Sequence, residues 1–288
     1  MENKKKYLVA TDLDRTLLPN GDQDYDGSMV IFREIIAREP LVLVYVTGRN
    51  LEEVKEAIKI YHPPLPLAAI TEIGTRIFYY HGKTFEEDTQ WTKELRLHSP
   101  NWNRELLQEM LSSIKNLRLQ GNEHQNLFKL SYYIDNPLEN QKILDQVKTI
   151  VKSSSPGSEI ISSIDETRNL GLLDIVPQKG TKMGALEYLR QKLGFEKEQV
   201  IYAGDSGNDL LPLTSGYRAI VVRNAIDEVK KEVWEIAQKK GIIDRVYLAR
   251  GYKQLNGYYV SGLIEGLIKL QIISPCYLNR LEENHQSQ

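Results

Sequence analysis

Short apolar runs that end in polar turns alternate with segments of helical spacing in the first part of the chain. The run that begins at Tyr7, and those at 41–46 and 67–70, are each bounded by turn residues, which is typical of buried strands in a parallel sheet. Between them, 27–38 and 51–61 carry apolar residues three and four positions apart, as amphipathic helices do. This alternation predicts a doubly wound α/β core with a mostly parallel sheet.

A central block of the chain, from about 86 to 172, has a different pattern. Long polar helices are predicted at 104–116 and 137–152, and the alternation from Phe128 to Ile134 is typical of a half-exposed strand in an antiparallel sheet. After this block the core pattern returns. We therefore predict a core made of residues 1–85 and 173–280, an inserted α+β cap at 86–172, and a frayed tail at 281–288.

Polar clusters stand at the ends of four predicted core strands or at the start of the helix that follows. In an open parallel sheet, ligands bind beyond the carboxyl ends of the strands, so these clusters are expected to meet at one edge. Each cluster alone is also explained as a turn or a helix cap, and the functional interpretation depends on their ordered recurrence. The candidate residues are Asp12, Asp14, Thr47, Gly48, Arg49, Lys182, Asp205, Asn208 and Asp209.

The chemistry of these clusters indicates a metal and a phosphate. Asp12 and Asp14 repel each other, and a bound hard cation or a retained proton relieves the conflict. Together with the carboxylates after Gly204, Asp12 supplies the oxygen ligands that Mg²⁺ prefers. Thr47 offers a hydroxyl to a phosphate, and Lys182 offers a neutralising ammonium, with Lys179 as the competing candidate.

Composition narrows the possible partners. The 37 basic and 39 acidic residues give a formal net charge of −2, so neither nucleic acid nor an anionic membrane is an expected partner. No apolar stretch approaches the roughly 20 residues of a membrane helix, and no apolar signal segment follows the Lys-rich start. The single cysteine, Cys276, excludes an internal disulfide framework, and the scattered histidines argue against zinc. These features favour a cytoplasmic protein.

The order and spacing of the four clusters resemble the haloacid dehalogenase superfamily of Mg²⁺-dependent phosphatases. The resemblance covers nearly the whole chain. It implies that Asp12 attacks phosphorus and becomes an aspartyl phosphate, while Asp14 protonates the leaving alcohol and then activates water. It further implies that Thr47 and Lys182 hold the phosphoryl oxygens. The implied Mg²⁺ ligands, direct or through water, are Asp12, the Asp14 backbone carbonyl, Asp205 and Asp209.

Within that superfamily, the chain most resembles the sucrose-6-phosphate phosphatases, which place a substrate-specifying cap between the Thr47 and Lys182 motifs. This resemblance implies a sugar phosphate as the small-molecule substrate, with sucrose 6-phosphate first. The stretches that carry it are Gln125–Asp135, Pro177-Gln178, Gly204–Asp209, Val221–Ala225 and Asn256–Leu267.

The predicted cap strand suggests where the sugar binds. Alternation puts Lys129, Ser131 and Tyr133 on one face of this strand, and Gln125 and Asn126 come just before it in the chain. These polar groups are expected to hydrogen-bond sugar hydroxyls, although a plain solvated face has the same pattern.

Three departures from the phosphatase pattern, at His124, Met183 and the return segment Ile164–Leu172, leave the phosphate chemistry intact. His124 and the return segment leave the sugar open. The main alternative is therefore a glucosyl- or mannosyl-3-phosphoglycerate or a related compatible-solute phosphate. A phosphotransferase and a non-catalytic binding module are further alternatives, and a sugar-phosphate synthase is an open partner.

Overall fold

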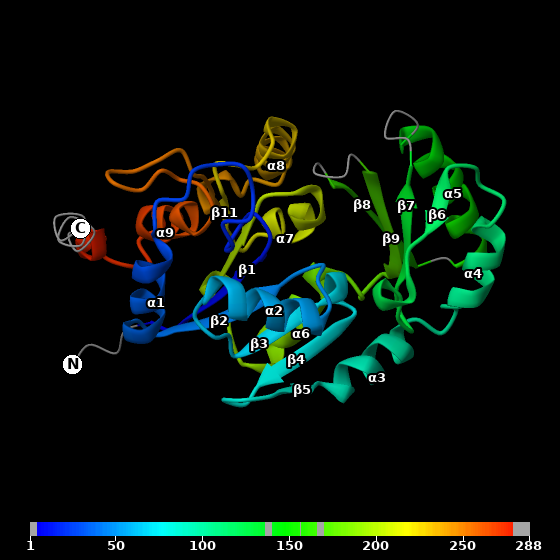
Figure 1. Cartoon of the computed structure of the whole chain (residues 1–288), viewed down its shortest axis with the longest axis horizontal. Coiled ribbons are helices and arrows are strands. Elements are labelled where there is room, and N and C mark those ends of the chain that lie inside the picture. The colour runs from blue at the N-terminus through cyan, green and yellow to red at the C-terminus, as the bar shows by residue number, and fades with distance from the viewer. Residues whose placement is uncertain (1–4, 136–139, 156, 166–169, 279–288) are drawn as a thin grey trace.

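The computed structural model describes residues 5–135, 140–155, 157–165 and 170–278. Within these ranges the strands form an eight-stranded sheet and a separate four-stranded sheet (Figure 1). The larger sheet is mostly parallel and the smaller one is antiparallel. The predicted fold class, a doubly wound α/β core with an α+β cap, is thereby confirmed. The predicted tail, 281–288, and positions 166–169 of the return segment lie outside the described residues.

The larger sheet is built from short apolar strands. They are β1 (Tyr7–Thr11), β2 (Leu41–Val46), β3 (Ala68–Thr71), β4 (Arg76–Tyr80), β5 (Phe85–Glu87), β10 (Val200–Gly204), β11 (Arg218–Val221) and β12 (Val246–Leu248). Their order is β12-β11-β10-β1-β2-β3-β4-β5, with β4 and β5 antiparallel at one edge. β1 is therefore central, and its carboxyl end lies between those of β10 and β2.

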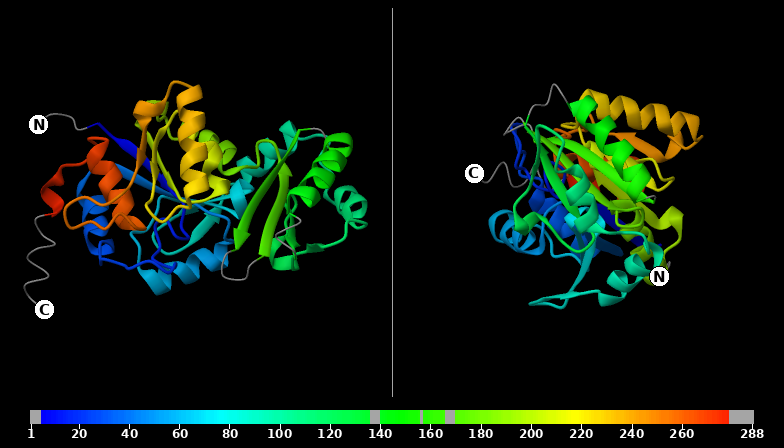
Figure 2. Two further views of the ribbon diagram at one scale, coloured as in Figure 1. Left: turned by 90° about the horizontal axis from the view of Figure 1, so that it is seen from above. Right: turned by 90° about the vertical axis from the view of Figure 1, so that its right-hand side faces the viewer.

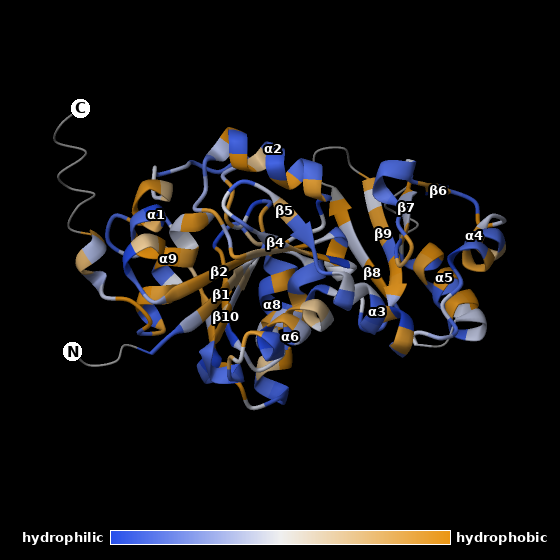
Figure 3. Ribbon diagram, turned by 90° about the horizontal axis from the view of Figure 1, so that it is seen from below, coloured by the Kyte–Doolittle hydropathy of each residue, from blue (hydrophilic) through white to orange (hydrophobic). Residues whose placement is uncertain are grey.

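Helices cover both faces of this sheet. One layer comprises α1 (Met29–Arg38), α2 (Leu51–Tyr61) and α9 (Val260–Lys269), and the other comprises α3 (Thr89–His98), α6 (Lys182–Lys192), α7 (Leu210–Leu213) and α8 (Asp227–Lys239). Along β1, Val9 packs into the first layer while Leu8 and Ala10 pack into the second. Figure 3 shows the resulting apolar strands between helices with polar outer faces. None of the helices in the described ranges is both long and apolar enough to cross a bilayer.

The smaller sheet forms the cap, which lies beside the core along the long axis of the molecule (Figure 2). Its strands are β6 (Leu117–Leu119), β7 (Leu130–Ile134), β8 (Ser158–Asp165) and β9 (Leu170–Pro177), in the order β6-β7-β9-β8. The helices α4 (Arg104–Leu111) and α5 (Asn140–Ser154) pack on one face of this sheet. The other face is turned toward the core (Figure 1).

Three local expectations differ from the structure. The helix predicted at 104–116 ends at Leu111, because the Ser112 hydroxyl donates to the Glu109 carbonyl and competes with the helical hydrogen bonds. The helix α3 was not predicted. β7 was expected to be half-exposed, but its residues are buried except for the half-buried Tyr133, since the segment before it folds back and the His124 carbonyl meets the Ser131 hydroxyl at 3.1 Å.

Two strands run across the predicted domain boundaries: β5 spans position 86 and β9 spans position 173. We propose that the chain leaves the core sheet after Glu87 and returns to the core after Pro177.

A tight turn after β3 joins several parts of the core. The short 3₁₀ segment η1 (Glu72–Gly74) has positive φ at all three residues: 51°, 65° and 116°. The Ile73 amide donates to the Thr47 carbonyl at 3.0 Å. Gly74 lies so close to Thr181 that a Cβ there would stand 2.2 Å from its carbonyl carbon. Only glycine fits at this contact, which sets the start of α6 against the end of β3.

Replacing Gly74 tests this close approach. We expect Gly74→Ala to lower the free energy of unfolding by about 3 kcal/mol or more, because overpacking adds to backbone strain. The matched control is Gly82→Ala, since Gly82 also has a positive φ, 78°, but no atom lies within 4 Å of its added Cβ. The control should cost only the strain of a side chain in the left-handed region, about 1–2 kcal/mol. Equal losses in denaturant unfolding would show that the contact with Thr181 is unimportant.

Candidate active site

The first two carboxylates of the site come from neighbouring strands. Asp12 follows β1 and Asp205 follows β10, and these strands are paired in parallel with Thr11 opposite Ala203. The Asp12 amide continues the ladder by donating to the Ala203 carbonyl at 2.9 Å. Parallel pairing thus brings two acidic residues, far apart in the chain, to the same edge of the sheet.

A third carboxylate completes the cluster. Asp209 ends the short turn η5 (Gly207–Asp209), and its Oδ2 accepts hydrogen bonds from the amides of Asp205 and Ser206, each at 3.2 Å. Carboxylate oxygens of Asp12, Asp205 and Asp209 all lie within 4.8 Å of one another, and all three residues are buried. Buried hard oxygens at this spacing form a group able to hold a metal ion.

A buried ammonium balances part of this charge. Lys182 is 1% exposed, and its Nζ donates to Oδ1 of Asp12 and of Asp209, each at 2.8 Å. The Nζ also donates to the Asn208 side-chain oxygen at 2.7 Å. The competing candidate, Lys179, is exposed. The structure therefore places Lys182, rather than Lys179, among the carboxylates.

The close approach of these charged groups shifts the pKa values of Asp12, Asp205 and Lys182. Burial raises the pKa of the Asp12 carboxyl well above its usual value, and Asp209 and Asp205 add to this against the opposing charge of Lys182. Burial, followed by the charge of Asp209, raises the pKa of Asp205 to about 7. Burial opposes the charge on Lys182, but Asp12 and Asp209 outweigh it and raise the pKa of Lys182. The three carboxylates thus exceed the positive charge that Lys182 supplies.

Asp14 occupies a different environment from Asp12. Its side chain is 41% exposed and is held by the Arg49 guanidinium, with Nη2 at 2.6 Å from Oδ1 and Nε at 2.9 Å from Oδ2. Asn20 donates to the same Oδ1 at 2.6 Å. Burial opposes ionisation, yet the hydrogen bonds and charge of Arg49 hold the pKa of Asp14 below its usual value. The two carboxyls of the first motif are therefore driven in opposite directions.

Thr47 and Gly48 follow β2 at the same edge. Thr47 is fully buried, and its Oγ1 accepts a hydrogen bond from the Arg49 amide at 3.1 Å. The Ile73 side chain would contact a Cβ added at Gly48, at 3.7 Å. The loop is thus fixed against the turn after β3.

The cap residues predicted to bind sugar are mostly engaged by protein. The Gln125 side chain bonds the amide and carbonyl of Ser131, both at 2.9 Å. Ser131 is fully buried and its hydroxyl donates to Asp174. Lys129 is buried with its Nζ 3.8 Å from Asp174 Oδ1. Asn126 reaches the core, where its amide donates to Glu72 and Thr75.

Sequence reasoning missed two acidic residues that contact these cap residues, Asp174 in the cap and Glu72 in the core. Asp174 is a buried carboxylate in β9, and its signal is a single acidic residue inside the apolar run Leu172–Val176. Glu72 is also buried, and it follows β3 as the other site residues follow their strands. Its pairing with the cap was not visible without the tertiary structure.

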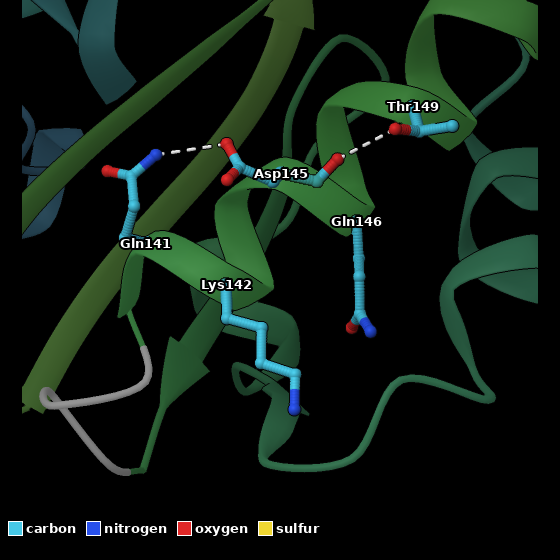
Figure 4. A pocket seen from close by; sticks show the side chains of 5 residues that line it. All are labelled: Gln141, Lys142, Asp145, Gln146 and Thr149. Carbon is cyan, nitrogen blue, oxygen red and sulfur yellow. Dashed lines mark hydrogen bonds between the residues drawn. The ribbon is translucent and has the colours of Figure 1, made fainter.

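A surface depression on the cap is unrelated to this cluster. Gln141, Lys142, Asp145, Gln146 and Thr149 line it, all from α5 (Figure 4). The Gln141 amide donates to Asp145 at 2.9 Å, so polar groups of α5 pair with one another along the helix. This helix covers the cap face away from the core (Figure 1).

Comparison with known proteins decides the family. The sequence profile of sucrose-6F-phosphate phosphohydrolases matches residues 5–270. The chain belongs to this family. Its members are phosphoric monoester hydrolases of the haloacid dehalogenase type, so the resemblance expected from the sequence is confirmed.

Individual relatives agree with the family. A relative from Nitrosococcus oceani is 38% identical over 266 residues, covering 92% of this chain and 71% of the relative. Sucrose-phosphatase 1 of Nicotiana tabacum is 30% identical over 244 residues, which are 82% of this chain. The match covers only 54% of the tobacco protein, so the chain spans about half the length of such plant relatives.

Among solved structures, the sucrose-phosphatase of Synechocystis in complex with sucrose and phosphate is similar over 93% of this chain and 98% of that one. The TM-score is 0.76 and the identity 26%. A haloacid dehalogenase-like hydrolase of Bacillus subtilis, 18% identical with a TM-score of 0.60, shares the fold.

Removing the buried ammonium tests the charge balance within this family member. In metal-free protein at pH 8, we expect Lys182→Met to lower the free energy of unfolding by about 3 kcal/mol, because Asp12 and Asp209 lose their counter-charge. The raised pKa of Asp12 gives stability that is greatest at low pH and is lost as pH rises through that pKa. The deficit should therefore shrink toward pH 5.

Denaturant unfolding at several pH values measures this effect. Lys179→Met is the matched control, because it removes the same charge from an exposed position. A deficit that is independent of pH, or one shared by the control, would contradict the proposed charge balance.

Proposed function

We propose that this protein is a Mg²⁺-dependent phosphatase that hydrolyses a sugar phosphate through an aspartyl phosphate, with sucrose 6-phosphate as the leading substrate. The observation that carries the proposal is the convergence of Asp12, Lys182 and Asp205 at one sheet edge beneath a cap. Membership of the sucrose-6F-phosphate phosphohydrolase family supports it.

In the proposed first step, an oxygen of Asp12 attacks phosphorus while the bond from phosphorus to the sugar oxygen breaks. Lys182 holds the other Asp12 oxygen and lies where its charge neutralises phosphoryl oxygens. Thr47, buried at the adjacent strand end, is the proposed hydroxyl partner of the phosphate. The departing sugar oxygen takes a proton from Asp14.

In the second step, water attacks phosphorus of the aspartyl phosphate and gives its proton to Asp14. Phosphate leaves and Asp12 is restored. The hydrogen bonds and charge of Arg49 hold the pKa of Asp14 below its usual value, so Asp14 is in the ionised form that can accept this proton, although the lowered pKa makes it a weaker base. For the acid role of the first step, Asp14 must carry a proton, so its contact with Arg49 is expected to loosen when a substrate is bound.

The residues present fit a divalent cation. Three buried carboxylates face one ammonium, and carboxylate oxygens are the donors Mg²⁺ prefers. Asp12 and Asp205 are the proposed direct ligands, while Asp209 is held by backbone amides and Lys182 and is proposed to orient the site. When bound, the cation supplies positive charge that favours ionised Asp12 and neutralises the phosphoryl group.

The cap face that is turned toward the core supports a hydroxyl-rich substrate. Ser131, Asp174 and Ile161 form one cross-strand row on this face. Lys129 and the half-buried Glu159 lie one row away. Sugar hydroxyls both donate and accept hydrogen bonds. Lys129, Ser131 and Asp174 are buried against one another, so the half-buried Glu159 carboxylate is the group of this set that is open to such a hydroxyl. The sucrose bound by the similar Synechocystis enzyme supports sucrose as the alcohol.

A compatible-solute phosphate is the second candidate substrate. A segment of glucosylglycerol-phosphate synthase from Pseudomonas anguilliseptica is 26% identical over 215 residues, covering 75% of this chain but 26% of the synthase. Because glycosyl glycerol and sucrose esters both present hydroxyls to a cap, a substrate comparison has to include both classes.

The first test is phosphate release from a panel of esters. With Mg²⁺, we expect the highest kcat/KM for sucrose 6-phosphate, compared with glucose 6-phosphate, glucosylglycerol phosphate and glycosylglycerate phosphates. Asp12→Asn should lower kcat by at least about 10³-fold, because the attacking oxygen is lost. Asp227→Asn, at an exposed carboxylate, is the matched control and should retain activity.

Label from ¹⁸O-water in the released phosphate distinguishes hydrolysis from transfer to another alcohol. Full activity of Asp12→Asn would refute the aspartyl phosphate, and equal rates on all esters would end the sucrose assignment.

The pH dependence of cation binding is a second test. Because the pKa of Asp205 is raised to about 7 in the metal-free protein, Mg²⁺ has to displace its proton at lower pH. We expect the affinity to fall by about tenfold or more per pH unit below pH 7, with proton release, because the pKa of Asp12 is raised as well. Calorimetric titration in buffers of different ionisation enthalpy measures both, and an affinity constant from pH 5.5 to 8 would contradict the site.

A further inference from the structure

Glu72 is a buried carboxylate that the proposed mechanism does not use. It is 4% exposed, and its φ of 51° is in the left-handed region, which non-glycine residues rarely adopt. Ile73 follows with a φ of 65°. Two such residues in succession cost roughly 1–3 kcal/mol each, so the surroundings must hold them in place.

The partners of Glu72 come from both domains. On the core side, Arg76 Nη1 lies 3.3 Å from Glu72 Oε1. On the cap side, the Asn126 amide donates to Glu72 Oε2 and, at 2.8 Å, to the Thr75 hydroxyl. The Asn126 side-chain oxygen accepts from the Phe128 amide at 2.7 Å. Each polar atom of the Asn126 side chain is therefore engaged, and the amide is fixed to the core.

The turn that carries Glu72 also supports the phosphate site. The Glu72 amide donates to the Arg49 carbonyl at 2.9 Å, and the next amide donates to the Thr47 carbonyl. Gly74 packs on the backbone of Thr181 and Lys182. The backbone of Glu72–Gly74 thus joins the contact between Glu72 and Asn126 of the cap to the residues proposed to hold the phosphate.

A second contact between cap and core lies at η5, which follows β10, whereas Glu72 follows β3. A Cβ added at Gly207 would stand 3.4 Å from the Ser162 carbonyl of β8. This contact involves the cap backbone and η5, whereas Glu72 and Asn126 meet through side chains. The side-chain contact is therefore the one that a substitution removes cleanly.

We propose that Glu72 is a positioning residue that fixes the cap over the phosphate site through Asn126 and so favours esters whose alcohol is large enough to reach the cap. This inference rests on the proposed phosphatase function and adds the contact through which the cap selects its substrate. A sugar phosphate is bound by both domains at once, and a small ester needs only the phosphate site.

The test compares two esters across matched variants. We expect Glu72→Ala to lower kcat/KM for sucrose 6-phosphate about tenfold and that for methyl phosphate less than twofold. Asn126→Ala removes the contact from the cap side and should give a similar loss with sucrose 6-phosphate. The double variant should be no worse than either single one, because both remove the same contact.

The control is Glu87→Gln, which removes another carboxylate partner of Arg76, 2.7 Å from its Nη2, away from Asn126. It should leave the ratio of the two kcat/KM values unchanged. A merely structural role for Glu72 would lower activity on both esters equally, and that result would overturn the proposal.

Amide hydrogen exchange of the same proteins provides a measure that does not depend on activity. In Glu72→Ala, peptides that contain 122–130 should exchange at least about threefold faster than in wild type, and those in Glu87→Gln should not. Where Glu72→Ala does not fold, Asn126→Ala provides the same comparison. Unchanged exchange in Glu72→Ala would refute the role of the Glu72 contact, whatever the activity. Failure of the wild type to hydrolyse either ester would refute the phosphatase function alone.

Discussion

The ammonium of Lys182 is bonded to Asp12 and Asp209 in a place that water hardly reaches. Three carboxylates crowd this space, and a single positive charge cannot balance them. The remaining negative charge makes this a group able to hold a metal ion, and together with burial it raises the pKa of Asp205 to about 7. Positioning of a phosphoryl group at this point needs little further machinery, because phosphoryl transfer depends mainly on alignment and charge neutralisation.

The rest of the molecule holds this cluster in place. Parallel pairing of β1 with β10 sets Asp12 beside Asp205, and α6 delivers Lys182 from the second part of the chain. The turn Glu72–Gly74 is the common support, since it contacts the Thr47 loop, the start of α6 and Asn126 of the cap. The cap contact and the proposed phosphate site are therefore connected through this turn.

The contrast between Asp12 and Asp14 shows how two carboxyls in one motif acquire different properties. They are separated by one residue, yet Asp12 faces buried like charges while Asp14 faces Arg49. Alternation suggested that both point to the same side, and it could not show which cation each would meet. Arg49 was a candidate site residue, and the structure shows that its guanidinium donates to Asp14.

The sequence alone determined the α/β core, its central strands and the clustering of Asp12, Lys182, Asp205 and Asp209, because hydrophobic periodicity and strand-end position are local properties. The engagement of Gln125 and Ser131 by protein, the buried Asp174 and the contact between Glu72 and Asn126 were decided only by the tertiary structure. These contacts depend on how the cap folds and docks, and docking geometry leaves no periodic trace along the chain.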